Sequence, residues 1–263
     1  ERWLRDQGST PLVTWEPFGT SLAAIASGAE DEEIRREARL LRGFAAPVML
    51  RFAHEMNGDW YPWSGVLNGR QGHPGSGARL YRQAWRRIWS IMHEERATNV
   101  VYVWCPNWRS YPQVRGNELA RFYPGHRYVD WVCVDAYNFG DNPSSGTRWR
   151  DLASMLGPIE SAYGRAKPIM IGETASVDVG GRAKARWIER ARKALRGHPG
   201  VRAVVWFDQS KRGNAWAVDS SSASLGAFRG WASDPYFNPR GFRAVGANAP
   251  DVVVDSAPAG TVS

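Results

Sequence analysis

Short apolar runs recur along the chain, and each is rich in β-branched residues and almost unbroken by polar side chains. Strands that are buried on both faces have this pattern, whereas strands with one face in water alternate apolar and polar positions. The six predicted strands are Leu12–Trp15, Val48–Phe52, Val100–Trp104, Val129–Val134, Ile169–Ile171 and Val201–Phe207.

Segments with helical periodicity lie between most of these runs. In residues 79–95, for example, Tyr81, Trp85, Ile88 and Met92 fall on one stripe of a helix. The predicted helices are residues 32–43, 79–95, 149–163, 183–196 and 221–231. Strands that alternate with helices indicate an α/β protein with a parallel sheet.

A (β/α)8 TIM barrel is the favoured architecture. The alternative is an open doubly wound sheet, whose nucleotide-binding form has a Gly-rich loop after a strand. The segment Gly75-Ser76-Gly77 follows no predicted strand and lacks the third glycine. A closed barrel has eight strands, and six are found, so we expect the first two βα units to be missing from this chain.

One catalytic domain is predicted over residues 1–243, because composition and length suit a single core. Residues 244–263 are small residues, Pro and Gly without periodicity, which predicts a linker or C-terminal tail. No window approaches the run of about 18 apolar residues that a membrane span needs, so no membrane partner is expected. The chain shows no signal peptide, and we expect a secreted protein whose signal peptide is absent from it.

Composition raises two further hypotheses. The net charge of +8 suggests nucleic-acid binding, but Arg82, Arg86 and Arg87 lie on a predicted helix, where a solvated face explains them, and no nucleic-acid motif accompanies them. No nucleic-acid partner is therefore expected. Cys105 and Cys133 lie in apolar runs. Buried free thiols are the favoured interpretation, with a disulfide between them as the alternative.

Aromatic residues are abundant, with 14 Trp, 9 Tyr and 9 Phe, and several occur in Gly-, Asn- and Pro-rich segments rather than in periodic ones. A tryptophan in a loop is unfavourable when it is left in water. These rings either cover a core or line a groove for the flat, apolar faces of sugars.

Two glutamates occupy the positions where a barrel enzyme carries its reacting groups, the carboxyl ends of strands. Glu55 follows the second predicted strand, and Glu173 follows the fifth. Glycoside hydrolysis needs such a pair, because one carboxyl donates a proton to the leaving oxygen while the other attacks or activates water. The two side chains are therefore predicted to face one pocket.

The surroundings predict which glutamate keeps its proton. Arg51 lies four residues before Glu55 and on the same strand face, and Glu173 is a candidate partner for its guanidinium. A cation there favours ionised Glu173. Glu55, beside Trp60 and Trp63, is expected to be less solvated and better able to stay protonated.

Three segments carry a family resemblance. They are Arg51-Phe-Ala-His54-Glu55-Met-Asn57-Gly58-x-Trp60, Val134-Asp135-Ala136-Tyr137-Asn138 and Gly172-Glu173. Together they resemble glycoside hydrolase family 26, the β-mannanases and their relatives. The resemblance implies a (β/α)8 barrel in which Glu55 is the acid/base after strand four and Glu173 the nucleophile after strand seven. Leu12–Trp15 then corresponds to barrel strand three.

The resemblance also implies roles for other residues. His54 orients the acid/base region, Tyr137 donates a hydrogen bond to the nucleophile, and Trp60 and Trp206 form sugar-stacking walls. The implied function is retaining, endo-acting hydrolysis of a β-linked polysaccharide, with β-1,4-mannan as first candidate. The family also contains mixed-linkage β-glucanases and xylanases, which remain alternatives together with a barrel that binds carbohydrate without cleaving it.

The remaining aromatic and polar candidates have a structural alternative each. Trp63, Trp15, Asn107 and Trp108 are predicted to contact sugar, although core packing also explains the tryptophans. After the last predicted strand come Asp208, Gln209 and Lys211, which suit either sugar hydroxyls or solvent, and Asp135 suits a catalytic or a buried structural role.

No metal or other cofactor is predicted. The His54-Glu55 pair resembles the start of a zinc-binding His-Glu-x-x-His motif, but position 58 is Gly. The expected partner is a polysaccharide or oligosaccharide substrate, and the protein is expected to act as a monomer.

Overall fold

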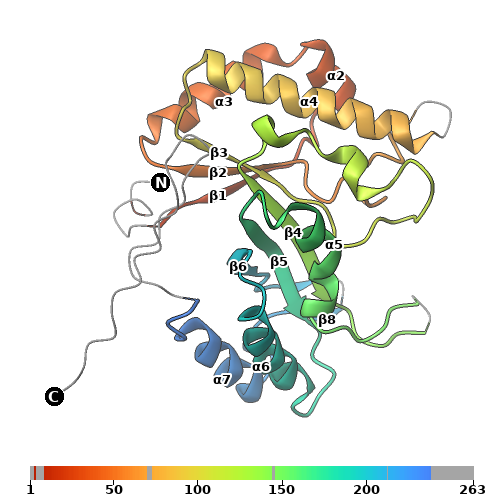
Figure 1. The fold of residues 1–263 in the computed structure, drawn as a ribbon, viewed down its shortest axis with the longest axis vertical. Coiled ribbons are helices and arrows are strands. Elements are labelled where there is room, and N and C mark those ends of the chain that lie inside the picture. The colour runs from red at the N-terminus through yellow and green to blue at the C-terminus, as the bar shows by residue number, and fades with distance from the viewer. Residues whose placement is uncertain (1–2, 4–8, 70–72, 144–145, 212, 238–263) are drawn as a thin grey trace.

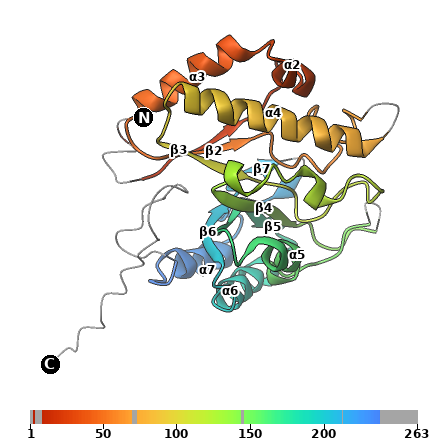
Figure 2. The ribbon, with the colours of Figure 1, turned by 45° about the horizontal axis from the view of Figure 1, so that its top comes forward.

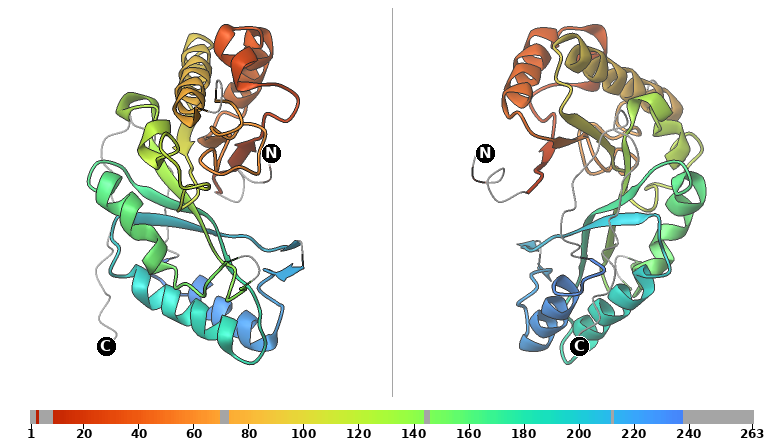
Figure 3. Two further views of the ribbon diagram at one scale, coloured as in Figure 1. Left: turned by 90° about the vertical axis from the view of Figure 1, so that its right-hand side faces the viewer. Right: turned by 60° about the vertical axis from the view of Figure 1, so that its left-hand side comes forward.

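A parallel sheet forms the centre of the computed structural model, which describes residues 3, 9–69, 73–143, 146–211 and 213–237. Its strands pair side by side in chain order and all run parallel. They are β1 (Leu12–Trp15), β2 (Val48–Phe52), β3 (Val100–Trp104), β4 (Trp131–Asn138), β5 (Ile169–Ser176) and β6 (Val201–Trp206). The sheet curls into an open half-barrel (Figure 3), which agrees with a barrel lacking part of its wall.

Helices cover the outer face of this sheet in two groups (Figures 1 and 2). The first group flanks β1 to β3 and comprises α2 (Leu22–Ser27), α3 (Asp31–Gly43) and α4 (Pro74–Glu94). The second flanks β4 to β6 and comprises α5 (Ala153–Tyr163), α6 (Ala183–Leu195) and α7 (Ser222–Ala232). Two 3-10 turns, η2 (Leu119–Phe122) and η3 (His126–Tyr128), precede β4. None of the helices within the described ranges is long and apolar enough to cross a membrane.

The elements largely follow the sequence prediction. The first three strands have the predicted bounds, whereas β4 and β5 continue to Asn138 and Ser176, beyond the apolar runs. An antiparallel pair, β7 (Ser210–Lys211) and β8 (Asn214–Ala215), and helix α2 were not predicted. Helix α2 spans only six residues, and its Ser21 cap accepts a hydrogen bond from the N–H of Ala24. The predicted tail, residues 244–263, lies outside the described residues.

Both faces of the central strands β2 to β5 are largely buried, whereas the edge strands β1 and β6 are partly exposed. The larger core lies between sheet and helices and includes Phe52, Trp85 and Trp187, while a smaller cluster on the concave side includes Val103 and Met170. Burial on both sides explains why the strands are nearly unbroken apolar runs.

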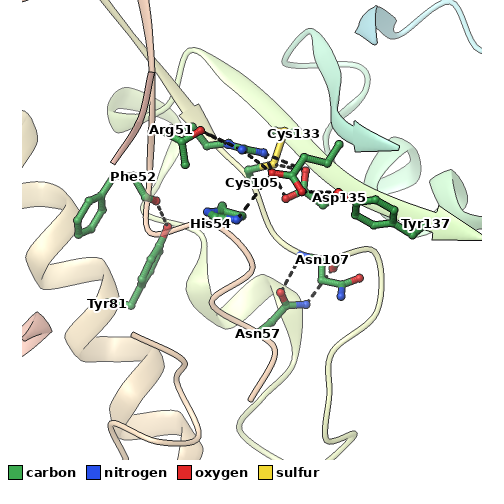
Figure 4. Close-up of a disulfide and its surroundings, with 12 residues drawn as sticks. Arg51, Phe52, His54, Asn57, Tyr81, Cys105, Asn107, Cys133, Asp135 and Tyr137 are labelled. Atoms are coloured by element: carbon green, nitrogen blue, oxygen red, sulfur yellow. Dashed lines mark hydrogen bonds and ion pairs between the residues drawn. A yellow bond between two sulfur atoms is a disulfide. The ribbon is translucent and has the colours of Figure 1, made fainter. Parts of the chain in front are cut away.

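The two cysteines are joined by a disulfide on the concave side of the sheet (Figure 4). In the pairing of β3 with β4, Trp104 lies opposite Val132, so the next residues along, Cys105 and Cys133, are neighbours. The favoured prediction of free thiols was therefore wrong, and the alternative is the observed state. The register of β3 on β4 places the two cysteines side by side, and this register could not be predicted from the sequence.

Candidate active site

Glu173 lies on β5 with both carboxylate oxygens hydrogen-bonded. Arg51 Nη2 donates to Oε1 at 2.6 Å, and the Tyr137 hydroxyl donates to Oε2 at 2.5 Å. Burial alone would raise the pKa of Glu173, but the positive charge of Arg51 and these two hydrogen bonds outweigh it and lower the pKa below its usual value. Glu173 is thus an anion near neutral pH. The predicted contacts of Arg51 and Tyr137 with it are confirmed.

Arg51 is itself held by neighbouring strands. Thr14 on β1 accepts from Nε at 3.0 Å and from Nη2 at 2.9 Å, and Asp135 on β4 lies 3.3 Å from Nη1. Arg51 and Asp135 lie beside the disulfide in Figure 4. Asp135 is fully buried, and burial together with the charge of Glu173 raises its pKa. Asp135 therefore supports Arg51 from the protein interior, as the structural interpretation of this residue predicted.

Glu55 lies just beyond β2 in a segment with an unusual backbone. Ala53 and Glu55 have φ values of 46° and 52°, in the left-handed region that side-chain-bearing residues rarely adopt. The N–H of Glu55 donates to Cys105 O at 2.8 Å, and its carbonyl accepts from Gly58 N at 2.9 Å. These bonds hold the strained turn and direct the Glu55 side chain.

The Glu55 carboxyl lies in a poorly solvated environment. Its residue is 8% exposed, and the Trp60 indole N–H donates to Oε2 at 2.7 Å. Burial, followed by the negative charge of Glu173, raises the pKa of Glu55 to about 7, although the Trp60 bond and Arg51 act in the other direction. Glu55 thus retains a proton up to near-neutral pH. A neutral acid beside an ionised carboxylate is the division of roles that glycoside hydrolysis requires.

His54 lies beside Glu173. Its Nε2 is 3.9 Å from Glu173 Oε1, and its buried Nδ1 has no hydrogen-bond partner within the described part of the chain. Burial, with the charge of Arg51, lowers the pKa of His54 to about 4, so the ring is neutral. The expected role of His54 in orienting the acid/base region stays a prediction.

Aromatic rings extend outward from the Glu55 side of the site. Trp60 is 39% exposed, and its ring lies 6.4 Å from that of Tyr111, which is 59% exposed. Tyr61 contacts the ring of His54 at 5.0 Å. Trp63 lies behind it, 2% exposed, stacked on Tyr61 at 4.4 Å and bonded to His54 O. Trp63 therefore supports this wall, which corrects the prediction that it contacts sugar.

Different rings line the Glu173 side. The ring of Tyr137 lies 5.7 Å from Phe207 and 5.2 Å from Trp216. Trp206, predicted as a sugar wall, turns the other way, because successive side chains of a strand point to opposite faces. Its ring contacts Trp187 on α6 at 6.1 Å and Phe228 on α7 at 5.5 Å. On this side Phe207 is half-buried, whereas Trp216 is 4% exposed and supports Tyr137 from within the protein.

Trp15, Asn107 and Trp108 occupy supporting positions. Trp15 packs edge-on against Phe52 at 5.8 Å, within the larger core. The backbone N–H and carbonyl of Asn107 both bond to the side chain of Asn57, each at 2.9 Å. Trp108 is half-buried beneath the guanidinium of Arg150, 5.1 Å from the ring. The core-packing alternative fits Trp15 better than direct sugar contact.

The residues after β6 have separate environments. Asp208 accepts a hydrogen bond from Val218 N at 2.7 Å, and Gln209 is exposed. Lys211 lies 5.9 Å from the ring of Phe207, and its charge contributes to lowering the pKa values of His54 and Glu55.

Two groups of potential metal ligands adjoin the site, and neither suits a cation. His54, Asp135 and Glu173 have ligand atoms within 4.8 Å of one another, but the guanidinium of Arg51 already provides the positive charge between the two carboxylates. The second group contains Cys105 and Cys133, whose sulfurs are in a disulfide and are not thiolates.

Comparison with known proteins identifies the family. Residues 20–171 match the family model of glycosyl hydrolase family 26. Endoglucanase H of Acetivibrio thermocellus is 34% identical over 226 residues, which cover 85% of this chain and 24% of that protein. Mannan endo-1,4-beta-mannosidase of Bacillus subtilis is 30% identical over 125 residues, 48% of this chain and 30% of that protein. The chain thus spans less than a third of the length of either relative.

Solved structures share the fold. A GH26 beta-mannanase from Bacteroides ovatus aligns with a TM-score of 0.62 at 18% identity, covering 89% of this chain and 70% of that one. The catalytic domain of the Bacillus sp. JAMB-750 GH26 endo-beta-1,4-mannanase gives a TM-score of 0.63 at 17% identity, covering 90% and 68%. The sequence match, the shared fold and the carboxyl pair agree, and the chain belongs to glycosyl hydrolase family 26.

Proposed function

We propose that this chain is the catalytic part of a retaining, endo-acting β-glycanase whose substrate is β-1,4-mannan. The observation that carries the proposal is the contrast between Glu55, buried beside Trp60 with a raised pKa, and Glu173, held as an anion by Arg51 and Tyr137. A retaining mechanism needs one carboxyl of each kind in the same pocket.

In the first step, Glu173 attacks the anomeric carbon of the sugar unit bound above it. The bond to the leaving glycosidic oxygen breaks as Glu55 transfers its proton to that oxygen, and a covalent glycosyl ester forms on Glu173. The rest of the polysaccharide leaves as a neutral alcohol. Arg51 and Tyr137 stay bonded to the carboxylate before the attack and so fix its orientation.

In the second step, Glu55 is ionised and acts as a base. It takes a proton from water, whose oxygen attacks the anomeric carbon and displaces Glu173. Two inversions restore the original configuration of the sugar. His54 is neutral beside Glu173 and so adds no positive charge next to the nucleophile.

Relatives support the substrate assignment. Mannanases appear among both the curated relatives and the solved structures with this fold. A second candidate, a β-glucan, is favoured by Endoglucanase H, because its match covers 85% of the chain. Both polymers have β-linked pyranose backbones, and the same pair of carboxyls would cleave either.

Polysaccharide digestion tests the proposal. The protein is incubated with mannan, barley β-glucan and xylan; reducing ends and product sizes are measured, and NMR follows the anomer released first. We expect mannan to give a ladder of internal fragments with β-anomers first. Fragments from β-glucan alone would select the second candidate. Retention on these polymers in an affinity gel without release would instead indicate a carbohydrate-binding barrel.

We also propose that the protein acts outside the cell and as a monomer. A polymeric substrate of this kind is met outside the cell, and the residues of the proposed mechanism, Arg51, Glu55, Tyr137 and Glu173, all come from one chain. Cell fractionation of the natural source and size-exclusion chromatography with light scattering test these two points. Protein confined to the cell interior, or activity found only in a dimer fraction, would contradict them.

A further inference from the structure

A buried lysine lies behind the Glu173 side of the site. Lys184 is the second residue of α6 and is 1% exposed. Its ammonium donates to the carbonyl oxygens of Ala215 at 2.8 Å, Trp216 at 3.0 Å and Ala217 at 2.6 Å, and to Ser220 Oγ at 3.0 Å. Three consecutive carbonyls thus converge on one side-chain nitrogen.

Burying a charged group is unfavourable unless its hydrogen bonds are replaced. Burial lowers the pKa of Lys184 to about 8, while the charges of Asp178, Asp208 and Asp219 act to raise it. Among the residues that the structure describes, the ammonium bonds to three carbonyls and a hydroxyl and to no carboxylate. Asp178 accepts instead from Ser220 at 2.8 Å. The ammonium therefore holds the backbone of residues 215–217 in place through hydrogen bonds to its carbonyls.

Residues 215–217 include Trp216, whose ring packs against Tyr137 in the candidate active site. Trp216 is 4% exposed and contacts Tyr137 at 5.2 Å and Phe139 at 5.1 Å. Its carbonyl accepts a second hydrogen bond, from the indole N–H of Trp206 at 3.0 Å. Lys184 lies 5.8 Å from the ring of Trp206, so both side chains hold the same peptide group from the helix side of β6.

We propose that Lys184 is a positioning residue for the nucleophile, because its ammonium fixes the Trp216 segment, Trp216 fixes Tyr137, and Tyr137 holds the carboxylate of Glu173. The chain of contacts is continuous from α6 to the Tyr137 hydroxyl, which donates to Glu173 Oε2 at 2.5 Å. The inference rests on the proposed function of Glu173. It also gives Trp206 a role, as the second donor that holds Trp216.

Three variants on α6 test the proposal. Lys184→Met (K184M) keeps the chain length and removes all donors, K184Q keeps an amide donor, and K193M removes an exposed lysine of the same helix as the matched control. We expect kcat to fall on the order of 10- to 100-fold in K184M, since a small displacement of a reacting group has an effect of this size. K184Q should fall between K184M and the wild type, with K193M unchanged. Rates are compared at temperatures where circular dichroism shows every variant folded.

The pH profile separates positioning from a merely structural role. Tyr137 stabilises the ionised form of Glu173, so a loosened Tyr137 raises the pKa of Glu173. The acid limb of the kcat/KM profile should then move to higher pH in K184M and not in K193M. Adding K184M to Y137F should cause little further loss, because the hydrogen bond that Lys184 positions is already absent in Y137F.

Equal kcat and an unmoved acid limb in folded K184M, or full additivity with Y137F, would overturn the inference. If K184M does not fold, K184Q and S220A are measured in the same way, and an unmoved limb in both would count equally against it. A wild-type protein that releases no sugar from any polymer would contradict the proposed function itself, which distinguishes the two failures.

Discussion

The surroundings of Glu173 and Glu55 differ in how far along the chain their partners come from. Glu173 depends on Arg51 and Tyr137, which lie on β2 and β4 and are 122 and 36 residues away. Glu55 depends on Trp60, five residues further on, and on the turn that contains both. The surroundings of the Glu173 carboxyl therefore depend on the arrangement of the whole sheet, whereas those of the Glu55 carboxyl depend on one local segment.

Opposite protonation of two identical side chains follows from this difference. The sheet brings a guanidinium and a phenol to Glu173, which stabilise its anion. The local turn surrounds Glu55 with protein and offers one indole N–H, so desolvation dominates and its pKa rises to about 7. Substitutions at each carboxyl and at its partners should therefore have separate and distinguishable effects.

Replacing Glu173 with Ala should have the largest effect. Without a nucleophile, turnover of polysaccharide should fall by about 10⁶-fold, the order seen when an enzyme loses its nucleophile. Added azide should restore part of the activity and give an α-glycosyl azide, because azide then attacks the sugar directly. Initial rates and product NMR provide the measurement, with E189A, on the exposed face of α6, as the control. Unchanged turnover in E173A would remove it from the mechanism.

Glu55→Ala should reduce polysaccharide turnover by about 10²- to 10⁴-fold, the usual contribution of a general acid. Aryl glycosides with good leaving groups should lose far less in the first step, since they need no proton. Azide should give the β-glycosyl azide here, the opposite anomer to that from E173A. The same anomer from both variants would show that the roles assigned to the two carboxyls are incorrect.

Trp60→Phe should shift the alkaline limb of the kcat/KM profile. Glu55 must be protonated to act as acid, so activity is expected to fall as pH rises through about 7. The Trp60 bond favours the ionised form, and its loss raises the pKa of Glu55. The alkaline limb should move to higher pH by about one unit, because one hydrogen bond to a charged group changes a pKa by about that much. A limb that moves down would contradict the assignment of this bond.

Tyr111→Ala should have the smallest effect and depend on substrate length. Its exposed ring continues the surface that begins at Trp60, on the side toward which Glu55 donates its proton. We expect KM to rise about 3- to 10-fold for long oligosaccharides, as for one lost aromatic contact. Short aryl glycosides should be unaffected, as should the control Y236A, which removes an exposed ring on a different part of the surface. A rise that is equal for all lengths would contradict this position for the substrate.

The sequence predicted the parts of the site that depend on strand order. Apolar runs located β1, β2 and β3 to the residue, and parallel strands bring their carboxyl ends to one edge, so the partners Glu55, Glu173 and Arg51 could be found. The carboxyl ends of β4 and β5 were harder to locate, because polar residues such as Asp135 and Glu173 form part of these strands.

Register and side-chain direction explain the errors. The pairing of Cys105 with Cys133 needs the register of β3 on β4, and the direction of Trp206 changes with each irregularity in the pairing of β5 with β6. A lysine on a helix is usually solvated, so nothing marked Lys184 as buried. Tyr111 lies in a loop without periodicity, where sequence patterns carry no positional information.

Covalent trapping tests the central claim most directly. A 2-deoxy-2-fluoro glycoside with a good leaving group is incubated with the protein, and the labelled peptide is located by mass spectrometry. We expect one fluoro-sugar per chain, attached to Glu173, and no label in E173A. A label on Glu55 or another residue, or hydrolysis that inverts the anomer with no trapped ester, would contradict it.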